Sequence, residues 1–411
     1  MSWYMLARFA SLGTAILMLG AATPAPQSSD LVDVAAANAV FGFRLLSALQ
    51  KAAPSENIVI SPASASLALA MARNGTSGQT ALEMAEALAL PGVSQDQINR
   101  GNAALIKQLQ SPAEGVTLNI ADSLWADSKR VALRASFVEL AKAFYNAEVA
   151  DVDFSDPDTP ARINAWVGKK THGKIDKIID RLNPSDVALL LNALYFKGQW
   201  THKFDPAQTK PHDFTLASGT TKKVPLMSQH GKFEYFETPA MQAIRLPYGK
   251  GDLIMDIFLP AKSSSLAALE EQLTARNWES WQSGFVETPG DIALPRYELK
   301  AEYGLNDALK ALGMRQAFDP AAADFHAMFE PAATARGVNF FISYVKQATY
   351  LKVDEEGSEA AAVTSIGITT TAFRPQPPPF HMVVDRPFLC VIEDLRTKAL
   401  LFVGAIYDPS P

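Results

Sequence analysis

The stretch from Asp354 to Ala372, DEEGSEAAAVTSIGITTTA, constrains the fold of this 411-residue chain more than any other segment. After Gly357 it contains small or β-branched residues and no Lys, Arg or Pro. One alternate set of side chains is uniformly small: Ser358, Ala360, Ala362 and Thr364. The set between them is Glu359, Ala361 and Val363. Because successive side chains of a strand point to opposite faces, this segment can enter the middle of a sheet with its charged face in solvent.

A proline-rich stretch ends this segment. Ala372 is followed by Phe373, Arg374 and the proline-rich residues 375–379. Proline cannot donate to a central ladder, so an inserted strand would stop here. On composition alone, the alternative is an Ala/Thr-rich surface loop followed by a proline linker. The rest of the chain decides between these two interpretations.

A series of stretches runs in order from about residue 30 to the C-terminus. They are Asn57–Ser64 (NIVISPAS), Gly75–Met84 (GTSGQTALEM), Ile163–Trp166 (INAW), Thr171–Ile175 (THGKI), Asn192–Trp200 (NALYFKGQW), Leu294–Tyr297 (LPRY), Leu312–Met314 (LGM), Phe318-Asp319, Asp385–Leu389 (DRPFL) and Phe402–Gly404 (FVG). Taken together at these spacings, they resemble the serpin superfamily of serine protease inhibitors. The resemblance is to a bacterial-type secreted member.

Helical and strand periodicities in the sequence indicate an α+β fold, with helices early and strands late. Helical spacing is found at 30–51, 64–71, 80–88, 136–145, 159–170 and 264–276. Strand-like runs are found at 116–124, 187–196, 233–236, 243–246, 253–259, 343–353, 380–384, 388–392 and 400–407. The resemblance implies a serpin fold, with eight or nine helices around three β-sheets and an exposed, insertable reactive-centre loop at about 357–379. No linker or repeat divides residues 30–411, so we expect a single domain there.

Residues 1–22 have the pattern of a secretory signal peptide. Arg8 is the only charged residue, 9–20 is apolar or small, and small residues follow for cleavage. The alternative is an N-terminal anchor or a disordered start. We expect an exported protein, extracellular or periplasmic, that is not membrane-bound once the signal is removed. The single cysteine, Cys390, excludes an intramolecular disulfide, and its apolar surroundings predict a buried thiol.

The sequence contains no enzyme signature. It has no G-x-S-x-G elbow, H-E-x-x-H helix, P-loop or dinucleotide fingerprint, and its six histidines are scattered singly. We therefore expect no catalytic residues, no metal and no cofactor. The net charge of −6 disfavours nucleic acid as a partner. The helical stretch 79–110 has only Arg100 and Lys107 as basic residues, so no strong heparin site is expected, and we expect a monomer.

The resemblance implies a suicide-substrate inhibitor of serine endopeptidases, with cysteine endopeptidases as a further class. Serpins are metastable, and a protease that cleaves the reactive loop forms an acyl-enzyme. The freed loop then inserts into the main sheet and traps the protease. The hinge of this movement is assigned to Glu355, Glu356, Gly357, Ser358, Glu359, Ala360, Ala361, Ala362, Val363 and Thr364. The absence of bulky or charged inward residues there favours an active inhibitor.

The reactive bond of a typical serpin lies fourteen positions after the hinge glycine, which here gives Thr371–Ala372. A small β-branched residue suits elastase-like or subtilisin-like proteases. A shift of two residues would present Phe373 to chymotrypsin-like enzymes. Arg374 would attract trypsin-like enzymes, but Pro375 follows it and makes that bond a poor substrate.

Two polar clusters of the family have counterparts here. The shutter beneath the central strands corresponds to Ser61, Ser64, Asn192 and Gln347. The last position is usually histidine, and glutamine cannot titrate near neutral pH, so we expect no imidazole-based pH switch. The breach at the top of the sheet corresponds to Trp200 and an Arg296–Glu355 ion pair. The alternative is that these residues simply pack the core.

Two further functions remain open from the sequence. One is a non-inhibitory serpin that acts as a carrier or binding protein. The other is a secreted hydrolase whose active site is assembled from distant residues. Covalent trapping of a protease would distinguish the inhibitor from both.

Overall fold

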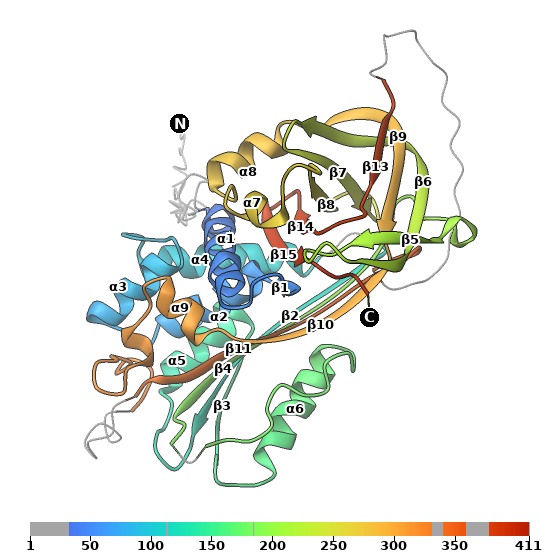
Figure 1. Ribbon diagram of the computed structural model, residues 1–411. Coiled ribbons are helices and arrows are strands. Elements are labelled where there is room, and N and C mark those ends of the chain that lie inside the picture. Colours follow the sequence, from blue (N-terminus) through green and yellow to red (C-terminus); the bar gives the residue numbers. More distant parts are fainter. Residues whose placement is uncertain (1–32, 112–113, 184, 331–339, 359–377, 411) are drawn as a thin grey trace, which may run out of the picture.

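The computed structural model describes residues 33–111, 114–183, 185–330, 340–358 and 378–410. The predicted signal peptide, 1–22, lies outside these ranges. The described residues form two sheets covered by helices (Figure 1).

The first sheet has six strands and contains the candidate site. Its order is β10 (Tyr297–Gly304), β11 (Ile342–Val353), β4 (Ala188–Gln199), β2 (Val116–Asp127) and β3 (Glu148–Val152), with the short β12 (Gly357–Ser358) also paired to β4. Strand β4 is apolar almost throughout and buried on both faces. Helix α6 (Thr159–Lys170) covers one face, and a group of other helices covers the opposite face (Figure 1). This double cover explains the continuous apolar run in the sequence.

The second sheet has nine strands. Its order is β1 (Ile58–Ile60), β15 (Ala399–Ile406), β14 (Phe388–Asp394), β8 (Leu253–Pro260), β7 (Met241–Tyr248), β6 (Thr221–Thr238), β9 (Val286–Pro295) and β13 (Phe380–Val383), with β5 (Lys210–Thr215) paired to β6. Strand β6 is 18 residues long and pairs with β5, β7 and β9 along its length. The resemblance implied three sheets, but β6 links the strands of two of them into one hydrogen-bonded sheet.

Nine α-helices lie in the described residues, and the α+β fold class is confirmed. They are α1 (Val34–Ala52), α2 (Pro62–Arg73), α3 (Gly78–Ala87), α4 (Gln95–Leu109), α5 (Ala135–Tyr145), α6, α7 (Leu266–Glu270), α8 (Ala275–Gln282) and α9 (Asn306–Ala311), with 3₁₀ turns at η2 (Pro206–Gln208) and η3 (Gln316–Phe318). The single helix predicted over 264–276 is wrong. The chain breaks after α7, and the Thr274 side chain accepts a hydrogen bond from Asn277 N to cap a new helix, α8.

Helix α2 brings two serines beneath the six-stranded sheet. Ser61 caps this helix and Pro62 occupies its first turn, where its missing N–H costs nothing. A Cβ at Gly42 of α1 would lie 2.4 Å from Pro62 Cγ, so the two helices can approach this closely only at a glycine. Residues 62–72 of α2 are all buried, which fixes the helix against β2 and β4.

Two smaller predictions concern the thiol and the membrane. Cys390 is free and buried, as predicted, and burial raises its pKa to about 12. Among the helices that the structure describes, none has the length and apolar character needed to cross a bilayer.

Candidate site of loop insertion

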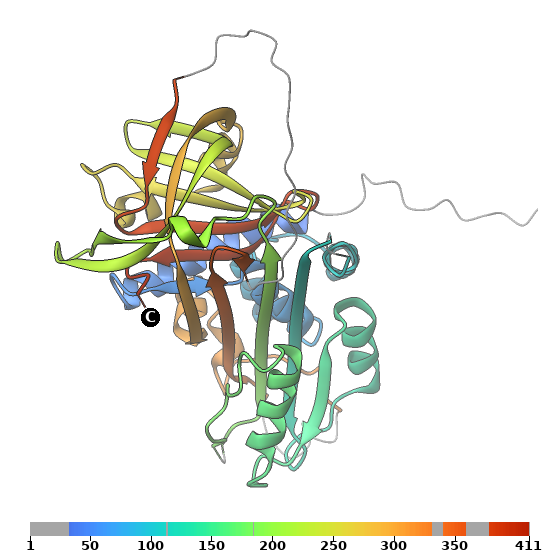
Figure 2. The same cartoon turned by 90° about the vertical axis from the view of Figure 1, so that its right-hand side faces the viewer.

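The boundary between β11 and β4 is the site where an added strand would enter the sheet. The two strands pair in parallel from Ile342↔Ala188 to Tyr350↔Tyr195. Beyond that pair the neighbour of β4 changes, because Gly357 pairs with Gln199 and Ser358 with Gly198 in antiparallel register. Figure 2 shows β10, β11, β4 and β2 side by side, with the β11–β4 boundary near the middle of the sheet. We call this boundary the seam.

A tight turn feeds the chain into the top of the seam. Asp354 N donates to Gly357 O at 2.9 Å, and Gly357 N donates to Asp354 O at 3.2 Å. Gly357 has a φ of +140°, and a Cβ there would lie 2.1 Å from the carbonyl oxygen of Gly198. Only glycine fits both the backbone conformation and this close approach.

Trp200, the residue that follows β4, anchors this turn. Its side chain is buried and stacks on Tyr248 with ring centroids 4.3 Å apart. Its indole nitrogen donates to Asp354 O at 2.8 Å, and its backbone N–H donates to Glu356 O at 3.1 Å. The predicted breach tryptophan therefore contacts the turn on both sides of Glu355.

The two glutamates of the turn each have a cationic partner. Arg296 Nη1 lies 3.6 Å from Glu355 Oε1, which also accepts a hydrogen bond from Thr209 Oγ1 at 2.7 Å. Lys203 Nζ lies 2.6 Å from Glu356 Oε2. The sequence suggested the Arg296–Glu355 pair but missed Thr209 and Lys203, which come from the segment after β4. These contacts hold the start of the hinge in place.

The four shutter residues form one buried hydrogen-bond network across the seam. Gln347 Oε1 accepts from Ser61 N at 2.9 Å, and Gln347 Nε2 donates to Ser61 O at 3.0 Å. Gln347 Nε2 also donates to Asn192 Oδ1 at 2.7 Å, which links β11 to β4. Asn192 Nδ2 in turn donates to Ser64 Oγ. Glutamine thus makes a complete set of bonds where the family usually has histidine.

Asp122 of β2 is a further member of this network that the sequence reading missed. It lies opposite Asn192 in the β2–β4 register and accepts a hydrogen bond from Asn192 Nδ2. Its side chain is buried, and burial raises its pKa to about 7 while the bond from Asn192 lowers it. A signal was present, because Asp122 has the same strand parity as the buried Leu118 and Leu124.

The segment after α6 crosses the outer face of the seam. The ring of His172 lies 4.8 Å from that of Tyr195 on β4. Lys174 Nζ lies 5.3 Å from the ring of Tyr350 on β11. These contacts bridge the two strands that would have to separate. We call residues 172–178 the crossing segment.

The remaining assigned residues lie outside the described residues. They are the distal hinge residues Glu359, Ala360, Ala361, Ala362, Val363 and Thr364, and the reactive-bond residues Thr371, Ala372 and Phe373. Their assignment stays a prediction from the sequence.

Comparison with known proteins identifies the family of this fold. The family model described as "Serpin (serine protease inhibitor)" matches residues 36–409. The chain belongs to the serpin family. Human Serpin B8 is 33% identical over 385 residues, which is 92% of this chain and 100% of that protein. An uncharacterised serpin-like protein from Thermococcus kodakarensis is 35% identical over 376 residues, 90% of this chain and 85% of its own length.

Solved serpin structures match the whole architecture. Native tengpin, a thermophilic serpin, has a TM-score of 0.83 at 29% identity and covers 94% of this chain and 96% of its own. Thyroxine-binding globulin in complex with thyroxine has a TM-score of 0.81 at 26% identity, covering 92% and 100%. The predicted serpin fold is thereby confirmed. In that second structure the protein is bound to thyroxine.

Proposed function

We propose that this serpin is an exported suicide-substrate inhibitor of serine endopeptidases. The observation that carries the proposal is the pairing of β12 with β4. Gly357 and Ser358 occupy the first positions of an added strand, in the antiparallel register that a continuing loop would follow. The residues after them have one uniformly small face, as an added central strand requires. The family description, serine protease inhibitor, supports the same conclusion.

The proposed reaction uses Thr371–Ala372 as the bait bond. The protease serine attacks the carbonyl carbon of Thr371, the peptide bond breaks, and the new amine leaves with Ala372. Thr371 then remains on the protease as an ester. If the freed loop inserts before water hydrolyses this ester, the protease is carried away and trapped. Elastase-like and subtilisin-like enzymes are the preferred targets, and Phe373 provides the alternative for chymotrypsin-like enzymes.

Insertion requires the seam to open along its full length. The Gln347–Asn192 hydrogen bond must break, because it joins the two strands that separate. The crossing segment must also move aside, since Lys346 Nζ on β11 donates to its Ile178 O at 2.9 Å. New main-chain hydrogen bonds to the added strand would offset these losses. The closed seam is therefore the barrier that keeps the protein in its active, metastable form.

The test mixes the mature protein with elastase, subtilisin, chymotrypsin and trypsin, and follows each mixture by denaturing gel and intact mass. We expect a denaturant-resistant complex with elastase or subtilisin and release of a peptide that begins at Ala372. The matched variant Thr371→Arg should transfer complex formation to trypsin. Cleavage without any complex, with the proteases still active, would contradict inhibition.

The same test addresses the alternative function. Thyroxine-binding globulin is among the similar solved structures, so a carrier role is the second candidate. A carrier would be cleaved in the loop without trapping the protease. If Thr371→Arg fails to trap trypsin while the unmodified protein traps chymotrypsin, the reactive residue is Phe373 instead.

A further inference from the structure

The shutter contains one buried group that can change its charge, the carboxyl of Asp122. It is 4% exposed and lies on the central strand β2, directly opposite Asn192 on β4. Asn192 divides its amide hydrogens between Asp122 and Ser64, while its oxygen accepts from Gln347 across the seam. The orientation of Asn192, and with it the bond across the seam, depends on Asp122.

The groups that face Asp122 are neutral around physiological pH. Asn192 on β4 and Ser64 on α2 do not titrate in that range. Tyr145 comes from α5, and burial raises its pKa to about 12, so its hydroxyl stays protonated. From α4, Ile106 lines the same space. Among the described residues that pack here, Arg73 is cationic, and its charge partly offsets the rise in the pKa of Tyr145.

A small cavity lies beside this carboxyl. The cavity has a volume of about 20 Å³ and lies between β2, α4 and α5. That volume holds about one water molecule. Polar and apolar groups line it in about equal measure, and Asp122 and Tyr145 are among the polar ones.

We propose that Asp122 is a positioning residue of the shutter whose protonation state sets how readily β4 and β11 separate. The inference rests on the proposed function for its purpose, since seam opening matters only if a loop inserts. The opening of the seam itself can be measured without a protease. The effect of Asp122 on that opening depends only on the geometry around Asn192.

The direction follows from the pKa shift. In the closed sheet burial raises the pKa of Asp122 to about 7, whereas a solvated Asp has a pKa of about 4. An opened seam that admits water moves the carboxyl toward the solvated value. Between these two pKa values the closed sheet binds the proton more tightly, so closure is favoured at low pH and lost as pH rises. Alkaline conditions therefore favour opening.

Hydrogen exchange of the intact mature protein, followed by mass spectrometry, tests this inference. The readout is the opening equilibrium of peptides from 342–353 and 188–199, corrected for the intrinsic pH dependence of exchange. We expect the opening equilibrium to rise about tenfold or more between pH 5.5 and pH 8. Asp122→Asn should abolish this rise and keep the opening equilibrium below the value that the unmodified protein shows at pH 5.5, because asparagine is neutral throughout.

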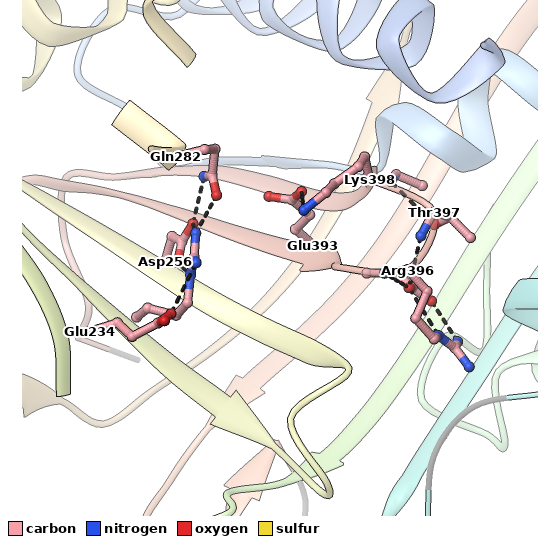
Figure 3. Close-up of polar contacts among 10 residues, drawn as sticks. Glu234, Asp256, Gln282, Glu393, Arg396, Thr397 and Lys398 are labelled. Carbon is pink, nitrogen blue, oxygen red and sulfur yellow. Dashed lines mark hydrogen bonds and ion pairs between the residues drawn. The ribbon is translucent and has the colours of Figure 1, made fainter. Parts of the chain in front are cut away.

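Glu393 on β14 provides a matched control. It is also buried, burial raises its pKa to about 7, and Lys398 Nζ lies 4.0 Å from its Oε1. It belongs to the other sheet, where the charge of Asp256 also acts on it (Figure 3). Glu393→Gln removes a comparable titrating group far from the shutter and should leave the pH dependence of seam opening unchanged.

The outcomes separate this inference from the proposed function. A flat profile in the unmodified protein, or an unchanged slope in Asp122→Asn, overturns the role of Asp122 even if protease complexes form. A pH-dependent opening that Asp122→Asn removes supports it even if no protease is trapped. If Asp122→Asn fails to fold, the pH dependence of seam opening in the unmodified protein and in Glu393→Gln still tests the inference. Loss of that pH dependence in Glu393→Gln would contradict it.

Discussion

Replacing Gln347 by leucine should make the seam open more easily without leaving a cavity in the core. Leucine has nearly the volume of glutamine but removes three hydrogen bonds, at 2.7–3.0 Å, to Ser61 and Asn192. Ser61 O keeps a bond from Ala65 N, so it stays satisfied. Ser61 N and Asn192 Oδ1 lose the partner described here, and an unsatisfied buried group costs about 1–3 kcal/mol. We therefore expect the closed state to lose about 2–6 kcal/mol.

The assay measures seam opening through uptake of a synthetic strand. An acetylated peptide with the sequence of residues 358–371, SEAAAVTSIGITTT, is incubated with the protein, and incorporation is followed by native mass spectrometry. Its single glutamate stays ionised near neutral pH. If the substitution lowers the free-energy barrier to seam opening, each 1.4 kcal/mol of that decrease should make incorporation about tenfold faster. The first denaturant-induced unfolding transition should also move to lower concentration.

Thr349→Val is the matched control on the same strand. Thr349 is as buried as Gln347, but its hydroxyl donates to Val59 O of β1 at 2.7 Å and makes no bond across the seam. It should lose about 1–3 kcal/mol of stability with little change in peptide uptake. If Gln347→Leu takes up the peptide at the rate of the unmodified protein, or only as fast as Thr349→Val, the network does not hold the seam closed.

Two further predictions concern the hinge, and a third concerns the buried carboxyl of Glu393. Ala362→Arg should convert the inhibitor into a substrate, because a buried charge would stall insertion, and full inhibition on a denaturing gel would refute the insertion mechanism. Gly357→Ala should displace β12, since its Cβ would lie 2.1 Å from Gly198 O; unchanged amide protection at Gly198 would contradict this. Burial raises the pKa of Glu393 from 4.5 to about 7, so its stabilising contribution, about 3 kcal/mol, is lost as pH rises from about 4 to 7. Glu393→Gln should make the free energy of unfolding depend less steeply on pH over that range. An unaltered pH dependence would argue against this role of Glu393.

Local periodicity was enough to predict much of the fold. The apolar run 187–196 gave the central strand β4, and helical spacing gave α5 and α6 to within about two residues. The prediction failed at 264–276, where a side-chain cap at Thr274 starts a second helix inside a continuous helical pattern. Periodicity reports which face of an element is buried but is insensitive to such a local break.

The candidate site was predictable only where a familiar motif carried it. Ser61, Ser64, Asn192 and Gln347 were named from resemblance, and the structure places them within one network. Asp122 was missed although it shares the strand parity of the buried Leu118 and Leu124, because a single carboxylate in a strand is usually a surface residue. The contributions of Lys203 and the crossing segment likewise could not be read from spacing.

The sequence by itself determined the small-faced hinge, the glycine that introduces it and the apolar strands on which it would insert. These properties depend on neighbours one to four residues apart, whose geometry every strand or helix repeats. Only the tertiary structure shows that β11 pairs with β4, that β12 pairs with the end of β4, and that a buried carboxyl joins the shutter network. Ser61 and Gln347 are 286 residues apart, and no local rule specifies which buried polar groups will meet across such a distance. That choice is made by the packing of α2 beneath the sheet, where each buried polar group must find a partner.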